Sequence, residues 1–395
     1  MDPVQNPYSP GAGVPPPELA GRRAELERFR IFAQRLAAAK VDQSMVITGL
    51  RGVGKTVLLN QFEKIARDAG AQSVFHEAAE DENFPRRIAV LLQELLQQVG
   101  FVERLKAKAR VALRAIAEFK MEYEGVKIAL DVQRAEALDL RLTRLFLRCG
   151  EALAEHLTAG IIFIDEIQYL STVELGAVVA AQHRCAQKGL PLSMAAAGLP
   201  LVHGRLGQAK SYAERLFTFP RIDRLQTADA AAALEKPAAE LGVPYEADAT
   251  RRIIELSQGY PYFLQEYGKM VWNLAEGPSV CLEDVAMAEP VVLEQLDDGF
   301  FRVRIERVTD AEREYLAAMA HELRFGDEST RRPGDVDALR SGQIAARLGK
   351  KVTSVAPTRS NLIAKGLIYS PQHGYAAFTV PQFELYMTRS YPHEP

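Results

Sequence analysis

The sequence predicts an α/β fold in which a parallel sheet is followed by a small helical lid and a C-terminal winged helix. Three observations lead to this class. A short apolar run over 45–48 leads straight into a glycine-rich turn, helical periodicity follows the turn, and a second strand-like run comes next. A strand, a helix and a strand in this order form the βαβ unit of a parallel sheet.

Helices and strands are expected to alternate along the first part of the chain. Apolar residues at every third or fourth position predict helices, and short apolar runs predict strands. Helices are expected over 22–37, 57–65, 84–114, 138–157 and 174–188, and strands over 45–48, 72–76, 160–164 and 190–197. Alternation over 119–132 predicts a hairpin around Gly125, so a helical and hairpin insertion is expected near 84–132. The run 160–164 is apolar throughout, as expected for a strand buried on both faces.

The 395 residues exceed what one hydrophobic core usually supports, so we expect two or three domains. Residues 1–17 contain six prolines and two glycines and are predicted to be a disordered tail. The sheet-containing core is expected over 18–225. A helical lid over 226–305, with helices at 229–241, 247–257 and 261–273, and a winged helix-turn-helix over 306–395 are expected to follow.

Composition argues against a globally basic nucleic-acid-binding protein, a zinc protein and a membrane protein. The net charge of −3 supplies no global positive field for nucleic acid, so any such site is expected to be local. The three cysteines, Cys149, Cys185 and Cys281, are far apart and lack zinc-ligand spacing, which indicates reduced thiols in a cytoplasmic protein. No window approaches the roughly 18 apolar residues of a membrane span, and no export signal is recognisable at the N-terminus. We therefore expect no membrane partner.

A phosphate-binding motif lies between a predicted strand and a predicted helix. Its residues fit G-x-x-x-x-G-K-[ST] and are Gly49, Leu50, Arg51, Gly52, Val53, Gly54, Lys55 and Thr56; Val57, the next residue, is counted with the nucleotide-binding segment. Glycines let backbone N–H groups surround phosphate, Lys55 is expected to reach the β- and γ-phosphates, and the Thr56 hydroxyl is expected to bind magnesium. The alternative is a chance glycine-rich turn. The strand and the helix on either side favour a nucleoside triphosphate instead.

Two carboxylates follow the most apolar strand. Asp165 and Glu166 come directly after Ile164, at the carboxyl end of a strand, where open α/β sheets bind ligands. Asp165 is expected to hold magnesium, and Glu166 to orient or deprotonate the attacking water. The alternative is that both residues only cap the following helix. The phosphate loop upstream favours the catalytic role.

Three segments carry a resemblance to a known family. They are Pro17-Glu18-Leu19-Ala20-Gly21-Arg22-Arg23-Ala24-Glu25-Leu26 ahead of the phosphate loop, Ile164-Asp165-Glu166-Ile167-Gln168, and Gly259-Tyr260-Pro261-Tyr262-Phe263-Leu264. From Glu18 onward the chain resembles bacterial P-loop ATP-binding proteins with an origin-recognition-like AAA ATPase domain (AAA+), which are related to archaeal-type and STAND ATPases. The resemblance implies an AAA+-like P-loop NTPase sheet and ATP, rather than GTP, as the nucleotide.

The resemblance also implies roles for three further residues. Arg22 or its backbone borders the adenine, Pro261 packs near the base and the ribose, and Arg215 matches an arginine finger that reaches a neighbouring subunit's γ-phosphate. Alternatively, Pro261 only starts a helix after Gly259, and Arg215 forms a solvated pair with Glu214.

One strand departs from the family pattern. The strand that begins near Leu192 ends in Ala195-Ala196-Ala197-Gly198, where many AAA+ proteins carry a polar sensor residue for the γ-phosphate. No lid arginine is clearly placed as a second sensor either. The resemblance therefore implies slow or conditional hydrolysis, which suits a switch better than a motor.

The C-terminal region is predicted to contain helices over 311–320, 343–349 and 352–365 and wing strands over 366–370 and 375–379. Residues 338–383 contain no Asp or Glu, and this local basic excess favours contact with a phosphate backbone. The candidate DNA contacts are Lys350, Lys351, Thr353, Ser354 and Arg359, with His373 at the wing tip. In STAND proteins the same module packs against protein, so that alternative stays open.

These observations predict a cytoplasmic ATPase that requires Mg2+ and acts as a nucleotide-controlled switch, with double-stranded DNA as the expected target. Glu166, Lys55 and Arg215 are the candidate catalytic residues, and Thr56 and Asp165 the candidate magnesium ligands. The alternative is a STAND-like signalling or scaffold ATPase, in which the winged helix binds protein and nucleotide controls self-association into a homo-oligomer.

Overall fold

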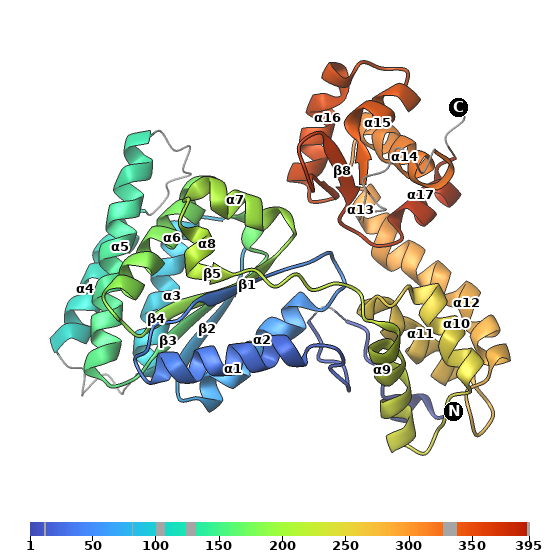
Figure 1. Ribbon diagram of the computed structural model, residues 1–395, viewed down its shortest axis with the longest axis horizontal. Coiled ribbons are helices and arrows are strands. Elements are labelled where there is room, and N and C mark those ends of the chain that lie inside the picture. The colour runs from blue at the N-terminus through green and yellow to red at the C-terminus, as the bar shows by residue number, and fades with distance from the viewer. Residues whose placement is uncertain (12, 81, 100–106, 124–131, 327–337, 393–395) are drawn as a thin grey trace. The chain divides into compact units, whose positions relative to one another are not determined.

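The computed structural model describes residues 1–392 except 12, 81, 100–106, 124–131 and 327–337 (Figure 1). The chain forms two compact units. The first comprises residues 22–49 and 55–222, and the second comprises 1–21, 50–54 and 223–395.

A five-stranded parallel sheet forms the centre of the first unit, in the order β2-β3-β4-β1-β5. Its strands are β1 (Ser44–Thr48), β2 (Gln72–Glu77), β3 (Gly160–Asp165), β4 (Leu192–Gly198) and β5 (Phe217–Thr218). The α/β class and the parallel sheet predicted from the sequence are confirmed; β5 was not predicted. Ala196 of β4 is in register with both Val46 and Ile164, so the carboxyl ends of β1, β3 and β4 lie at one edge.

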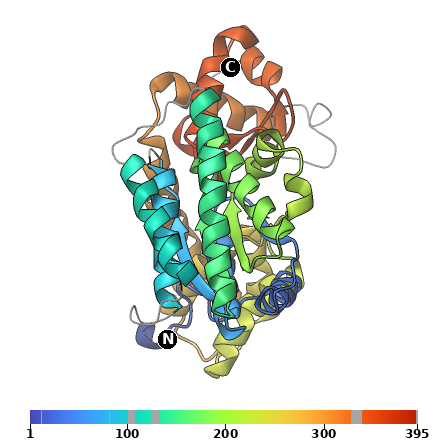
Figure 2. The same cartoon turned by 90° about the vertical axis from the view of Figure 1, so that its left-hand side faces the viewer.

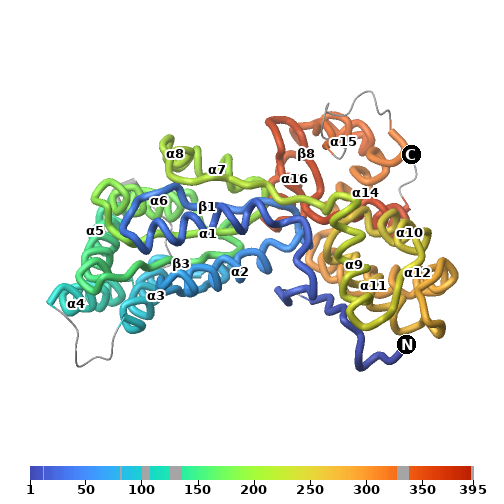
Figure 3. The backbone as a smooth tube through the Cα atoms, turned by 60° about the horizontal axis from the view of Figure 1, so that its bottom comes forward, coloured from blue at the N-terminus to red at the C-terminus, as the bar shows by residue number. Residues whose placement is uncertain are grey.

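Helices cover both faces of this sheet. Successive side chains of β3 point to opposite faces, and both faces are buried. Phe163 lies 5.9 Å from the ring of Phe29, whereas its neighbours Ile162 and Ile164 belong to a separate apolar core on the opposite face. The Phe29 face is covered by α1 (Arg23–Ala37) and α2 (Lys55–Asp68), which lie side by side (Figure 3). The opposite face carries α3 (Phe84–Gln98), α5 (Val132–Glu155) and α6 (Thr172–Gln187), and α4 (Ala107–Glu122) packs on α3 and α5 (Figure 2).

The predicted hairpin in the insertion is wrong where the structure describes it. Residues 119–122 continue α4, because Ala112, Ile116 and Phe119 recur at helical spacing and are buried in the core that α4 shares with α3 and α5. Residues 124–131, which include Gly125, lie outside the described residues. The helical part of the insertion is present as α3 and α4.

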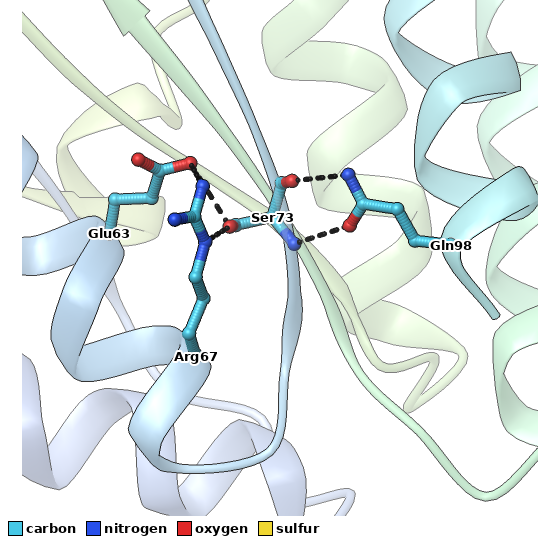
Figure 4. Close-up of polar contacts among 4 residues, drawn as sticks. All are labelled: Glu63, Arg67, Ser73 and Gln98. Carbon is cyan, nitrogen blue, oxygen red and sulfur yellow. Dashed lines mark hydrogen bonds and ion pairs between the residues drawn. The ribbon is translucent and has the colours of Figure 1, made fainter.

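At the outer edge of β2, the backbone groups of Ser73 form hydrogen bonds with a side chain and not with another strand. The Gln98 amide accepts from the Ser73 N–H at 3.3 Å and donates to the Ser73 carbonyl at 2.9 Å. On the other side, the Ser73 hydroxyl contacts Arg67 and Glu63 of α2 (Figure 4). Pairing of these backbone groups removes part of the free edge that would otherwise attract another chain.

The second unit begins with a helical lid formed by α9 (Thr227–Glu240), α10 (Ala247–Ser257), α11 (Pro261–Leu274) and α12 (Leu282–Leu296). The predicted disordered N-terminal tail is wrong, because it packs on this lid. Tyr8 is buried, and its hydroxyl donates to the Leu234 carbonyl at 2.5 Å. The Trp272 indole donates to the Asp2 carbonyl at 2.9 Å. Apolar burial of Tyr8 and bonds to backbone outweigh the extended preference of the prolines.

Replacing Tyr8 with alanine is expected to release this segment from the lid. The ring fits against Gly268, where an added Cβ would lie 2.8 Å from Tyr8 Cδ1, so the truncation leaves a cavity that costs about 3–5 kcal/mol. Limited proteolysis should then cleave within residues 1–17 faster than in the wild type. Tyr8→Phe keeps the ring and serves as the control. Equal cleavage of Tyr8→Ala and wild type would contradict the docking.

The C-terminal part of the second unit holds a three-stranded antiparallel sheet in the order β6-β8-β7. The strands are β6 (Ala338–Arg340), β7 (Ile368–Tyr369) and β8 (Tyr375–Phe378). The predicted helices and the predicted strand pair β7–β8 are present. The predicted helices are α14 (Asp310–Phe325), α15 (Ser341–Arg347) and α16 (Val352–Ala364). The strand β6 and the helix α17 (Phe383–Ser390) were not predicted.

Shorter elements connect these parts. In the first unit they are the 3-10 turn Ile167–Tyr169 (η3), α7 (Leu201–Ala209) and α8 (Ala213–Leu216). In the second unit they are the 3-10 turn Pro3–Gln5, the π-helical turn Asp297–Arg302 and α13 (Val303–Ile305). Across the part of the chain that the structure describes, none of the helices has the length and apolar character needed to cross a membrane.

Candidate functional site

The glycine-rich loop leaves β1 and enters α2, as the motif predicts. The Gly49 N–H donates to the Gly198 carbonyl at 3.2 Å, which continues the pairing of β1 with β4. Gly52 and Gly54 have φ values of 81° and 90°. An added Cβ at Gly54 would meet nothing within 4 Å, so glycine is required there by the backbone conformation and not by lack of space. The helix α2 begins at Lys55.

The structure brings the two predicted magnesium ligands together. The Thr56 hydroxyl donates to Asp165 Oδ2 at 2.6 Å, although the residues are 109 positions apart in sequence. Asp165 is 1% exposed at the end of β3, and Lys55 is also buried. Burial raises the pKa of Asp165, while bonds from Thr56 and from the Glu166 N–H and the charge of Lys55 act in the opposite direction.

These groups fit a magnesium ion bound with a nucleotide. Mg2+ prefers oxygen ligands and is usually held by one or two protein groups together with phosphates. A hydroxyl and a carboxylate whose oxygens are 2.6 Å apart provide such a pair. Both stand where the phosphate loop becomes α2, whose N-terminal end favours negative charge.

Glu166 follows Asp165 in a left-handed backbone conformation. Its φ is 51°, which a residue with a side chain adopts at some energetic cost. The Glu166 N–H donates to Asp165 Oδ1 at 2.8 Å. Glu166 makes no side-chain capping bond to η3, and the next α-helix, α6, is capped by Ser171 and Glu174. These contacts do not support the alternative in which Asp165 and Glu166 only cap a helix.

Sequence reasoning missed a contribution from Gln168. Its amide donates to the Glu166 carboxylate and accepts from the Leu199 N–H at 3.0 Å. The residue lies two positions after Glu166 in the family-like segment, but its partner Leu199 follows a different strand. Only the pairing of β3 with β4 reveals this contact.

The residues implied by family resemblance lie at separate places. Arg22 is buried and precedes α1. Arg215 is exposed on α8, as an arginine that reaches another subunit must be. Pro261 is the first residue of α11, and Gly259, with φ of 74°, leaves no room for a Cβ beside the Leu225 carbonyl. Gly259 and Pro261 thus account for the boundary between α10 and α11. The nucleotide role of Pro261 stays a prediction.

Four of the five proposed DNA contacts are exposed, Lys350 among them. Lys351 precedes α16, Thr353 and Ser354 lie in its first turn, and all three are exposed. Arg359 differs from the prediction. It is half-buried, and its guanidinium donates to Ser370 Oγ at 2.9 Å and to the Tyr375 carbonyl at 2.7 Å. These contacts tie α16 to the β7–β8 pair and give Arg359 a structural role.

The basic excess of residues 338–383 is reduced by carboxylates from α14. Lys365 pairs with Glu312 at 2.6 Å, Arg347 with Glu322 at 2.9 Å, and Lys350 with Glu314 at 3.2 Å. Burial acts to raise the pKa of Glu312, but its bonds from Lys365 and Thr309 outweigh burial, so the net pKa is lowered. The positive charge available to a phosphate backbone is therefore smaller than the sequence window indicates.

Comparisons with known proteins agree with this fold. Residues 18–195 match a family model described as an AAA ATPase domain, and residues 298–387 match one described as a domain of unknown function (DUF8462). A comparison with curated proteins found no match.

Two solved structures are similar over nearly the whole chain. A Walker-type ATPase of Pyrococcus abyssi is 16% identical with a TM-score of 0.54, and the alignment covers 93% of this chain and 96% of that one. The ORC2 protein of Aeropyrum pernix, solved as ADPNP–ADP complexes, is 17% identical with a TM-score of 0.53 and 96% coverage of both chains. Residues 18–195 are thus similar to an AAA ATPase domain, and the chain shares its fold with these two proteins.

Proposed function

We propose that the chain hydrolyses ATP in the presence of magnesium. The observation that carries this proposal is the 2.6 Å contact between the Thr56 hydroxyl and Asp165, with Glu166 next in the chain. This contact joins the last residue of the phosphate-binding motif to the carboxyl end of β3 in a partly buried site. Magnesium, when bound, neutralises charge that develops on the phosphates.

Each residue of the site then has a separate task. The Lys55 ammonium attracts the β- and γ-phosphates, and the Thr56 hydroxyl and Asp165 hold the metal. Glu166 orients the attacking water or accepts its proton, because its carboxylate is not needed as a metal ligand. Arg215, exposed on α8, supplies a positive charge to a second copy of the chain.

The first experiment measures phosphate release from magnesium-ATP by the wild type and by Lys55→Ala, each with and without duplex DNA. The wild type should release phosphate, and Lys55→Ala should release almost none, because a buried cation that binds the phosphates is gone. Removal of magnesium with a chelator should have the same effect. Release that persists in Lys55→Ala would come from a contaminant or another site and would refute the proposal.

We further propose that nucleotide state acts as a switch for DNA binding by the C-terminal region. The exposed residues Lys351, Thr353 and Ser354 at the start of α16 favour this role, because a helix start with a lysine and two hydroxyls suits a phosphate backbone. The ion pairs with α14 favour the competing role, in which the region binds protein. DNA-stimulated ATP turnover supports the first role. ATP-dependent self-association without any effect of DNA supports the second.

Lys351→Glu is expected to weaken retention on duplex DNA uniformly across sequences. The negative slope of log affinity against log salt should become less steep by about 1, because one phosphate contact is lost. Retention on a DNA column at several salt concentrations measures both effects. The matched control is Lys188→Glu, a change of the same charge at an exposed residue of the first unit. Equal losses in both variants would show that the surface of α16 has no special role.

A further inference from the structure

The space beside Gly198, at the end of β4, is already filled. An added Cβ at Gly198 would lie 2.8 Å from Gln168 Oε1, 2.8 Å from Val202 Cγ2 and 3.0 Å from Ile167 Cγ2. Contacts below 3.0 Å require neighbouring atoms to shift. A polar sensor side chain at Gly198 would therefore collide with Gln168, which occupies that space with its own amide.

Both ends of the Gln168 amide are used, and they reach two different strands. The Nε2 group donates to the Glu166 carboxylate at the end of β3, and Oε1 accepts from the Leu199 N–H at 3.0 Å, directly after β4. A single amide thus links the candidate base to the backbone at the carboxyl end of β4. A side chain held at both ends has little freedom to change rotamer.

The backbone of Gln168 is also anchored. Arg205 of α7 donates to the Gln168 carbonyl and, at 2.6 Å, to the Leu170 carbonyl, so it holds the η3 turn at its middle and at its C-terminal end. Arg205 is half-buried, and its location fixes η3 to the helix that follows β4. The turn that carries Gln168 is therefore attached to the β4–α7 connection through side chain and main chain.

We propose that Gln168 is a positioning residue for Glu166, and that it supplies the link between β4 and the site that a sensor side chain supplies elsewhere. This role rests on the proposed hydrolysis of ATP. Gln168 directs the Glu166 carboxylate through its Nε2 hydrogen bond. If the backbone at Leu199, directly after β4, moves, the same amide moves the Glu166 carboxylate with it. The competing explanation is that Gln168 only stabilises the η3 turn.

The test compares Gln168→Met, which keeps the side-chain length but cannot form either hydrogen bond, with the wild type. We expect kcat for ATP to fall by about 10- to 100-fold, since a displaced catalytic group costs rates of this order, while the Kd for ATP is unchanged. The matched control is Gln182→Met. Gln182 is a buried glutamine in this unit, whereas Gln168 is half-buried, and the Gln182 amide donates to Ser193 Oγ at 3.0 Å, not to Glu166. Gln182→Met should keep the wild-type kcat.

A second measurement separates positioning from stability. Single-turnover rates of Glu166→Gln and of the double variant Glu166→Gln with Gln168→Met should be equal, because Gln168 acts through the Glu166 carboxylate. A further loss in the double variant, or a wild-type kcat in folded Gln168→Met, would overturn the proposal. Absence of Lys55-dependent phosphate release from the wild type would instead overturn the proposed hydrolysis, and with it this role.

Discussion

Replacing Glu166 with glutamine is expected to lower ATP turnover by about 10²- to 10⁴-fold, the usual contribution of a general base. Glutamine keeps the shape of the side chain and one acceptor oxygen but does not take up a proton from water. The contact between Thr56 and Asp165 does not involve the Glu166 side chain, so ATP affinity should change little. Phosphate release gives the rate, and equilibrium dialysis with magnesium-ATP gives the affinity.

The control for this variant is Glu94→Gln, which removes a carboxylate from a half-exposed position on α3. Its turnover should equal that of the wild type. If Glu166→Gln hydrolyses ATP at the wild-type rate, Glu166 is not the base. If ATP binding is lost together with turnover, Glu166 instead contributes to the nucleotide site itself.

Replacing Phe29 with alanine is expected to destabilise the first unit by about 3–5 kcal/mol, the usual cost of a cavity left by a buried aromatic ring. Phe29 is fully buried between α1 and the sheet. Its ring is stacked on Phe62 of α2 with centroids 4.2 Å apart and lies 5.9 Å from Phe163 of β3. Because α2 and β3 carry Thr56 and Asp165, loss of this packing also loosens the site.

Thermal unfolding measures this effect, and Tm should fall by roughly 6–20 °C for a unit of this size. Phe325→Ala is the matched control, because the same atoms are removed from a ring that is 65% exposed at the end of α14. Its stability should stay within about 0.5 kcal/mol of the wild type. A wild-type Tm for Phe29→Ala would show that the α1–α2 face contributes little to stability.

The local parts of the site could be predicted because they are short and continuous. The phosphate loop needs glycines, a lysine and a threonine at set spacing, and its neighbours show the strand and helix on either side. Asp165 and Glu166 follow an apolar run that only a buried strand explains. Of the two, Asp165 accepts the hydrogen bond from the Thr56 hydroxyl, and this contact was found only in the structure.

The Gln168 amide could not be predicted in the same way. Its two partners, Glu166 and Leu199, follow different strands, and the contact depends on the register of β3 with β4. From sequence, Gly198 indicated only that a sensor side chain was missing. In the structure, the Gln168 amide, Val202 and Ile167 fill the space beside Gly198.

The free positive charge of the C-terminal region could not be predicted from sequence either. The window 338–383 has no carboxylate of its own, yet α14 brings Glu312, Glu314 and Glu322 to three of its basic residues. Ion pairs form between residues that are distant in sequence, so a count within one window overestimates the free positive charge.

The sequence by itself determined the α/β class, the phosphate loop and the paired carboxylates, because these depend on periodicity and on neighbours along the chain. Tertiary structure alone decided that the proline-rich N-terminal segment packs on the lid through Tyr8, that α4 continues over 119–122, and that Gln168 joins Glu166 to β4. In each case the deciding free energy comes from burial or hydrogen bonds between distant segments, which local composition does not contain.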